Sequence, residues 1–202
     1  MPKAKASKPR RTQAERREQS RQAVLESACK LFGERGYADT SLEDICADCG
    51  LTIRPVYHYF GNKKNLFAAV NEHLSARILD TMVDELGDNP DEAMRQSWRS
   101  FLDLCDDPGF RRIVLIDGPN VLGRGQWAES PAYLKATELV GSTQSPRTSR
   151  KKFRYGLVNR VMMGAMAEAA LMVAAADDIP MAKREAEQLI MTMFSRLQDY
   201  SD

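Results

Sequence analysis

The chain has 202 residues, of which 43% are hydrophobic and 28% are charged. This length predicts one or two domains with a sizeable core, and the composition is that of a globular protein. We expect no membrane span, because no run approaches the roughly 18 to 20 apolar residues that a span requires. We also expect no secretory signal, because the basic N-terminus lacks an apolar stretch. These exclusions predict a cytoplasmic protein.

Charge is unevenly distributed, although the net charge is only +1. Residues 1–64 hold 13 Lys and Arg against 8 Asp and Glu, whereas residues 65–202 hold 16 against 20. The basic residues 1–64, followed by an acidic remainder, suggest a polyanionic partner for the N-terminal part of the chain. The alternative interpretation is that the basic residues only keep the chain soluble.

Cys46 and Cys49 form an isolated C-x-x-C motif, and Cys29 and Cys105 are the other cysteines. A zinc site needs about four ligands, and the only histidines are His58 and His73. A redox C-x-x-C usually accompanies a βαβ pattern, which we do not find. We therefore expect neither a metal nor a cofactor, and free thiols that suit a reducing compartment.

Helical patterns begin after residues 1–11, which lack apolar periodicity and are expected to form a disordered basic arm. From Thr12 to Arg35 the apolar residues recur with a helical period, and Gly36 is expected to end this helix. The expected buried stripe consists of Val24, Ala28, Leu31 and Phe32.

Two short helices are predicted next. The first is capped by Ser41 with Asp44 or by Thr40 with Glu43, because either pair resembles a capping box, and it runs to about residue 48. Gly50 breaks it, since glycine tolerates the left-handed conformation of a tight turn.

The second short helix covers residues 53–60, with Thr52 as a plausible N-cap. Pro55 lies within its first turn, so the helix is expected to begin at 53, 54 or 55. Asn62 can cap a long helix from Lys63 to about residue 86.

The rest of the chain is expected to hold helices over residues 91–106, 110–116, 125–140, 149–176 and 181–200. Breaks are expected at Pro108-Gly109 and at Gly118-Pro119. The last helix carries an apolar stripe of Ala186, Leu189, Ile190, Met193, Phe194 and Leu197. We find no strand and no repeat, so the predicted fold is all-α with about nine helices.

Residues 41–60 are the most informative segment, because a capped helix, a glycine turn and a second short helix make a helix-turn-helix. In this motif the second helix enters the major groove of DNA. Here that helix carries Arg54, Tyr57, His58 and Tyr59 within two turns, and polar aromatics and a cation suit phosphates and base edges.

The stretch of residues 40–67 resembles the DNA-binding domain of the TetR (tetracycline-repressor-like) family. The residues that carry the resemblance are Thr40, Ser41, Asp44, Ile45, Gly50, Val56, Tyr57, Phe60 and Lys63. It implies a three-helix DNA-binding domain over residues 12–67, followed by a helical-bundle ligand-sensing and dimerisation domain over residues 68–202. It also implies a homodimer joined through the final two helices, residues 149–176 and 181–200, and a double-stranded operator.

Roles for single residues follow from the same resemblance. Phosphate contacts are implied for Thr40, Ser41, Thr52, Tyr57, His58 and Lys63. Positions near base edges are Ile53, Arg54 and Pro55, and Glu43 is placed to accept a hydrogen bond from a cytosine amino group. Ile53 and Pro55 depart from the family's pattern, which puts the operator sequence in doubt but not the fold.

The second domain is expected to bind a small, largely apolar effector that releases the DNA. Candidate pocket walls are Trp98, Phe101, Leu102, Cys105, Trp127, Tyr133, Met163 and Met166. The alternative for these aromatic and Met stripes is plain core. Glu168, on an otherwise apolar helix face, is either an interface carboxylate or a reader of a cationic ligand.

Other functions are weighed against this one. No G-x-S-x-G, phosphate-binding loop or H-E-x-x-H motif occurs, so we expect no catalytic residues and no enzyme. A DNA-binding protein that acts constitutively, answers to a protein partner or activates transcription remains the alternative.

Overall fold

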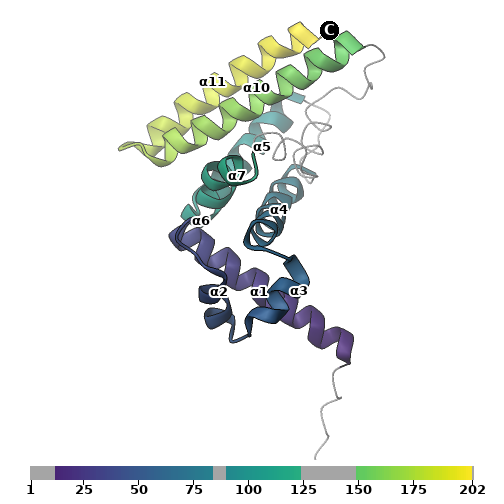
Figure 1. Cartoon of the computed structure of the whole chain (residues 1–202). Coiled ribbons are helices and arrows are strands. Elements are labelled where there is room, and N and C mark those ends of the chain that lie inside the picture. Colours follow the sequence, from purple (N-terminus) through teal and green to yellow (C-terminus); the bar gives the residue numbers. More distant parts are fainter. Residues whose placement is uncertain (1–11, 84–89, 124–148, 202) are drawn as a thin grey trace, which may run out of the picture.

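A computed structural model describes residues 12–83, 90–123 and 149–201, and these residues are helical with no strand among them. Helices α1 (Gln13–Arg35), α2 (Leu42–Cys49) and α3 (Ile53–Phe60) form one group at the lower end of the molecule (Figure 1). Helix α4 (Lys63–Val83) leads away from this group toward α5 (Pro90–Cys105). The all-α prediction is confirmed.

The chain then continues through α6 (Pro108–Phe110), a π-helix η1 (Arg111–Asp117) and α7 (Gly118–Val121). Helices α10 (Ser149–Ala174) and α11 (Ile179–Ser201) pack side by side as a hairpin at the opposite end from α1–α3 (Figure 1). The predicted helix 125–140 lies outside the described residues, so the expected total of about nine helices stays a prediction.

The N-terminal helices begin and end where local signals predicted. Thr12 caps α1 in a capping box with Glu15, and Gly36 ends the helix with a φ of 87° that favours glycine. The predicted stripe of α1 is buried, with Val24, Ala28 and Phe32 fully inaccessible to solvent. This stripe packs against Ile45 of α2, Val56 of α3 and Phe67 of α4 in one hydrophobic core.

Of the two predicted helix breaks, the first lies at residues 106–107, just before Pro108, and the second is wrong, because the chain stays helical from Pro108 to Val121. Pro108 opens α6, where Asp107 accepts a hydrogen bond from the Gly109 amide at 2.8 Å. Pro119 lies in the first turn of α7. At Pro108 a proline costs little, because the amide that it lacks would lie in the first turn of α6 and have no intrahelical acceptor there.

The last two helices form as predicted, with one error in the face that they bury. Ile190 and Phe194 of α11 are buried, but Leu189 is 57% exposed. On α10 an exposed row runs through Leu157, Val161 and Met172. Large apolar side chains are therefore left uncovered along both helices of the hairpin.

One part of α10, Gly156–Ala174, is long and apolar enough to cross a membrane, with a mean hydropathy of 1.4. This corrects the expectation that no run would approach that length. Leu, Val, Ala and Met residues keep the mean hydropathy high in spite of Arg160 and Glu168. Length and composition alone are weak evidence for a span, because core helices of water-soluble proteins meet the same criteria.

Candidate nucleic-acid interface

The N-terminus of α2 is held by a capping box between Ser41 and Asp44. The Ser41 hydroxyl oxygen accepts from the Asp44 amide at 3.0 Å, and the Asp44 carboxylate accepts from the Ser41 amide at 2.9 Å. The Ser41 hydroxyl also donates to the Asp44 carboxylate at 2.6 Å, and this bond, together with that from the Ser41 amide, lowers the pKa of Asp44. Of the two predicted capping boxes, the structure contains this one.

Thr40 lies inside the domain and not at its surface. Its side chain is 1% exposed, and its hydroxyl donates to the carbonyl oxygens of Gly36 at 2.8 Å and Leu31 at 3.2 Å. The hydroxyl therefore ties the end of α1 to the start of α2. The phosphate contact that the resemblance implies for Thr40 stays a prediction. Glu43, one turn into α2, is exposed.

The turn between α2 and α3 depends on Gly50, which adopts the left-handed conformation with φ 69° and ψ 24°. The amide of Leu51 donates to the Cys46 carbonyl at 3.1 Å and closes the end of α2. Behind this turn, the Asp48 carboxylate accepts from the Ser27 hydroxyl at 2.7 Å and from the Lys30 ammonium at 2.6 Å. These bonds fix α2 against α1, and they lower the pKa of Asp48.

Helix α3 has one buried face and one exposed face. Val56 and Phe60 are buried against the core, whereas Arg54 and His58 are exposed and Tyr57 is 53% exposed. A tyrosine with this exposure presents its hydroxyl to solvent rather than to the core. The exposed face therefore offers one cation and several hydrogen-bonding groups within two turns.

The start of α3 is open to an anion. Thr52 occupies the N-cap position, is exposed, and makes no side-chain capping bond. Helix N-termini leave backbone N–H groups without intrahelical acceptors and carry a partial positive charge. An anion at this end would find the Thr52 hydroxyl and the first amides of α3 together. Ile53 and Pro55, beside it, are half-buried.

Lys63, at the start of α4, is half-buried and already has partners. Its ammonium lies 4.3 Å from the centroid of the Tyr37 ring and donates to the Ala38 carbonyl at 3.4 Å. A phosphate would have to compete with these contacts or share the ammonium with them. Lys64 is exposed directly beside it, and sequence reasoning did not single it out.

Arg21 is a second cation near α3 that the sequence reasoning missed. Its guanidinium lies 5.7 Å from the centroid of the Phe60 ring, so α1 brings a positive charge to the end of α3. The available signal was the excess of Lys and Arg over residues 1–64. That signal gave no indication which of these side chains would lie next to α3.

Most of the described residues that were predicted to contact the effector are buried on α5 and α10. Trp98, Phe101, Leu102 and Cys105 form one buried face of α5, and Met166 of α10 is 2% exposed. Burial raises the pKa of the Cys105 thiol to about 12. Met163 is half-buried, and Trp127 and Tyr133 lie outside the described residues. The Trp98 indole nitrogen is buried and has no hydrogen-bond partner within the described parts of the chain.

The two regions meet where η1 touches α1. Arg112 donates to the Gly33 and Glu34 carbonyls at the end of α1, and the Asp117 carboxylate accepts from the Tyr37 amide at 2.8 Å. A Cβ added to Gly33 would lie 3.0 Å from the Gly109 Cα. Close packing and charge-assisted bonds thus join α1 to α6 and η1.

Two family models match the chain. The model for bacterial regulatory proteins of the tetR family matches residues 24–70, and the model for the tetracyclin repressor-like C-terminal domain matches residues 91–197. The first match contains α2, α3 and the exposed face described above. The second match covers more than half of the chain.

Curated relatives match over part of their length. An HTH-type transcriptional repressor of Mycobacterium tuberculosis is 40% identical over 62 residues, which are 31% of this chain and 33% of that protein. The HTH-type transcriptional repressor AcnR of Corynebacterium glutamicum is 30% identical over 113 residues, which are 51% of this chain and 60% of AcnR. The chain thus spans less than two thirds of each of these relatives.

Solved structures share the fold along most of the chain. A TetR-family transcriptional regulator from Pectobacterium atrosepticum is 29% identical and has a TM-score of 0.61, with 91% of this chain and 95% of that chain covered. A tetR-family regulator from Streptomyces coelicolor, 24% identical, has a TM-score of 0.66 and covers 91% of this chain and 82% of its own. Since the second family model alone spans more than half of the sequence, the chain belongs to the TetR family of bacterial regulatory proteins.

Proposed function

We propose that this protein is a cytoplasmic DNA-binding transcriptional regulator that represses its target by binding a palindromic operator as a homodimer. The observation that carries the proposal is the two-faced helix α3. Its buried Val56 and Phe60 fix the helix, and its exposed Arg54, Tyr57 and His58 are left for the major groove. Residues 12–67 are the DNA-binding domain in this proposal, and residues 68–202 are the sensing and dimerisation domain.

The roles divide between base reading and phosphate binding. Arg54 is proposed to read a base edge, because a guanidinium can bind guanine through two hydrogen bonds. Tyr57 and Thr52, with the open N-terminus of α3, are proposed to hold a phosphate. Lys63 remains a proposed phosphate ligand that would share its ammonium with the Tyr37 ring.

The test is selection of duplexes from a randomised pool, followed by affinity measurements at several salt concentrations. Arg54→Ala should change the preferred base at one position per half-site and cost about 1–3 kcal/mol there. Tyr57→Phe should weaken all sequences alike. Arg77→Ala, which removes an exposed cation of α4 outside residues 12–67, is the control with the same change of charge. Unchanged base preferences for Arg54→Ala would contradict the base-reading role.

Dimerisation is proposed through the exposed row of α10 together with α11. Arg160, Gly164 and Glu168 lie one helical turn apart on that row, and all three are exposed. A Cβ at Gly164 would meet nothing within 4 Å, so a second helix can approach closely there. If two α10 helices cross in antiparallel fashion at Gly164, a two-fold axis places Arg160 next to the partner's Glu168.

Charge reversal tests this arrangement. Glu168→Arg should shift the protein toward monomer in sedimentation experiments, because two arginines would then face each other across the interface. Adding Arg160→Glu to that variant should restore the dimer, since the reversed pair is complementary again. A wild-type monomer at micromolar concentration would contradict the dimer, and a double variant no better than Glu168→Arg would contradict the crossing point.

Regulation is proposed to occur through a small, largely apolar effector within the second domain. Its candidate contacts are the buried aromatic face of α5 with Met163 and Met166, and the Trp98 indole N–H is a donor that an effector could satisfy. An effector acts only if it prefers the conformation that does not bind DNA. Helix α4 connects this domain to α3, and the α1–η1 contacts supply a second connection.

Reciprocity supplies the test of effector action. Operator DNA must weaken effector binding by the same factor by which the effector weakens DNA binding, typically 5- to 150-fold. Calorimetric titration of an effector with and without operator measures this factor. Equal affinities would favour the alternative of a constitutive regulator or one controlled by a protein partner. Whether binding represses or activates is settled by transcription from the operator-bearing promoter.

A further inference from the structure

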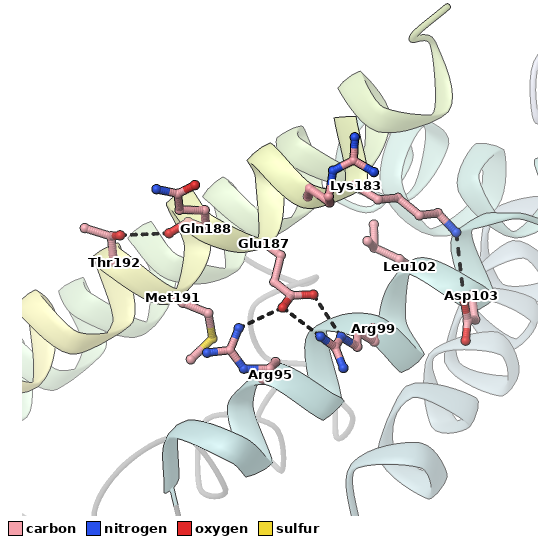
Figure 2. Close-up of a pocket in the computed structure, with 10 residues that line it drawn as sticks. Arg95, Arg99, Leu102, Asp103, Lys183, Glu187, Gln188, Met191 and Thr192 are labelled. Carbon is pink, nitrogen blue, oxygen red and sulfur yellow. Dashed lines mark hydrogen bonds and ion pairs between the residues drawn. The ribbon is translucent and has the colours of Figure 1, made fainter. Parts of the chain in front are cut away.

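A charged groove runs between α5 and α11, on a different side of α5 from its buried aromatic face. Its volume is about 680 Å³, within the range of pockets that hold small molecules. Figure 2 shows side chains from the two helices pointing toward one another across it. Of the described residues that the sequence indicated as effector contacts, Leu102 lines the groove.

Charged side chains line the groove. Among the described residues, its lining contains the cations Arg95, Arg99, Lys183 and Arg184 and the carboxylates Asp103 and Glu187. Lys183 lies 4.0 Å from Asp103 and 3.4 Å from Asp106, and Arg95 lies 3.8 Å from Glu92 as well as 2.7 Å from Glu187. An anion that enters the groove would meet guanidinium groups from both helices.

The two arginines of α5 converge on one carboxylate of α11 (Figure 2). Glu187 Oε1 accepts from Arg95 Nη1 at 2.7 Å and from Arg99 Nη2 at 2.9 Å, and Glu187 Oε2 accepts from Arg99 Nε at 2.8 Å. The Glu187 side chain is 18% exposed, whereas those of Arg95 and Arg99 are 36% and 52% exposed. A single carboxylate thus holds two guanidiniums in place, and both remain accessible from the groove.

The bonds to Glu187 show which chemical group the two arginines bind. Arg99 binds both oxygens of the carboxylate through parallel N–H donors, which is the geometry in which guanidinium recognises a planar carboxylate. These bonds hold the pKa of Glu187 below its usual range. A second carboxylate presented from the groove could use the same fork chemistry.

Apolar atoms lie beside the charged ones. Leu102 is 4% exposed and forms part of the wall on α5, and Met191 is half-buried on α11. A bare inorganic anion would leave this surface in water. A molecule with both an acid group and a hydrocarbon part would cover it while its carboxylate met the arginines.

We propose that this groove binds a small organic acid, with its carboxylate at Arg95 and Arg99 and its hydrocarbon part against Leu102 and Met191. The site borders the buried face of α5 that is proposed for the apolar effector and shares Leu102 with it. It does not depend on operator binding, because every group that it needs lies on α5 and α11.

Calorimetric titration of the full-length protein without DNA tests the proposal with defined probes. Hexanoate and benzoate are the acids, and 1-hexanol and benzyl alcohol are neutral partners of matched shape. The acids should bind saturably, and the alcohols at the same concentrations should not. Saturable binding of an alcohol equal to that of its acid, or no saturable binding of either acid, would overturn the proposal.

Variants locate the site. Arg99→Gln should weaken hexanoate by about ten-fold, the scale of one charge-assisted hydrogen bond. Glu187→Gln should tighten it, because the internal competitor loses its charge while both arginines remain. Arg184→Gln, at an exposed position of the groove, should also weaken hexanoate and serves if Arg99→Gln fails to fold.

The matched control is Arg196→Gln, which removes a cation of α11 outside the groove lining and should bind like the wild type. If Arg196→Gln weakened hexanoate as much as the groove variants did, binding would reflect net charge alone and the site would be refuted. Because no DNA is present, failure here is distinguishable from failure of the proposed regulatory function.

Discussion

The contact between α4 and η1 gives the sharpest stability prediction, and it centres on Gly118. The Ile113 carbonyl accepts from the Gly118 amide, which closes the π-helix, and also from Asn71 Nδ2 at 3.0 Å. Asn71 is 2% exposed. A Cβ at Gly118 would lie 2.6 Å from Asn71 Nδ2 and 2.9 Å from the Ile113 oxygen, so Gly118→Ala must push this pair apart.

Gly118→Ala should weaken the Asn71–Ile113 contact and, in the opposite direction, favour the helical backbone. A buried amide without its partner costs about 1–3 kcal/mol, and relief of the overlap costs a similar amount. Gly118 has φ −52°, which alanine adopts freely, so the backbone adds no strain and helix propensity returns about 0.5–1 kcal/mol. We expect Gly118→Ala to lower the free energy of unfolding by about 1–5 kcal/mol.

Urea unfolding at one fixed protein concentration, followed by circular dichroism, measures this cost. A double-mutant cycle with Asn71→Ala isolates its cause, because that variant removes the amide that the new methyl group would strike. The double variant should be more stable than the sum of the two single losses predicts, by about 1–3 kcal/mol. A neutral Gly118→Ala, or additive losses, would refute the reasoning.

Three further predictions concern charges and the hairpin. The pKa of Asp48 is lowered in the folded protein because Lys30 and Ser27 donate to its carboxylate. Asp48 therefore stabilises the folded state fully above the ordinary carboxyl pKa near 4, and this stabilisation is lost as the pH falls through the lower pKa of the folded state. Asp48→Asn should therefore reduce the stability difference between pH 7 and pH 3, as measured by urea unfolding, and an unchanged difference would count against this. Arg112→Met should cost about 1–2 kcal/mol, because the carbonyls at the end of α1 lose a charge-assisted donor, and an unaltered urea midpoint would contradict it. Leu189→Glu should promote monomers in sedimentation experiments without lowering the helix content, because Leu189 is exposed in the single chain. An unfolded variant would show instead that this side chain belongs to the core.

Local chemistry made the DNA-binding helices predictable from the sequence alone. The Ser41–Asp44 capping box and the left-handed turn at Gly50 depend on residues within a few positions of each other. Apolar periodicity likewise identified the buried faces of α1 and α5, because a helix that packs on one side repeats its apolar residues every three or four positions.

Tertiary structure decided what local signals could not. Thr40 is buried because its hydroxyl binds two carbonyls at the end of α1. Pro108 begins a helix because Asp107 caps it. The charged groove arises because α11, some ninety residues further along the chain, places Glu187 between Arg95 and Arg99. Periodicity within one helix reports which residues share a face, but only the packing of distant helices determines what that face meets.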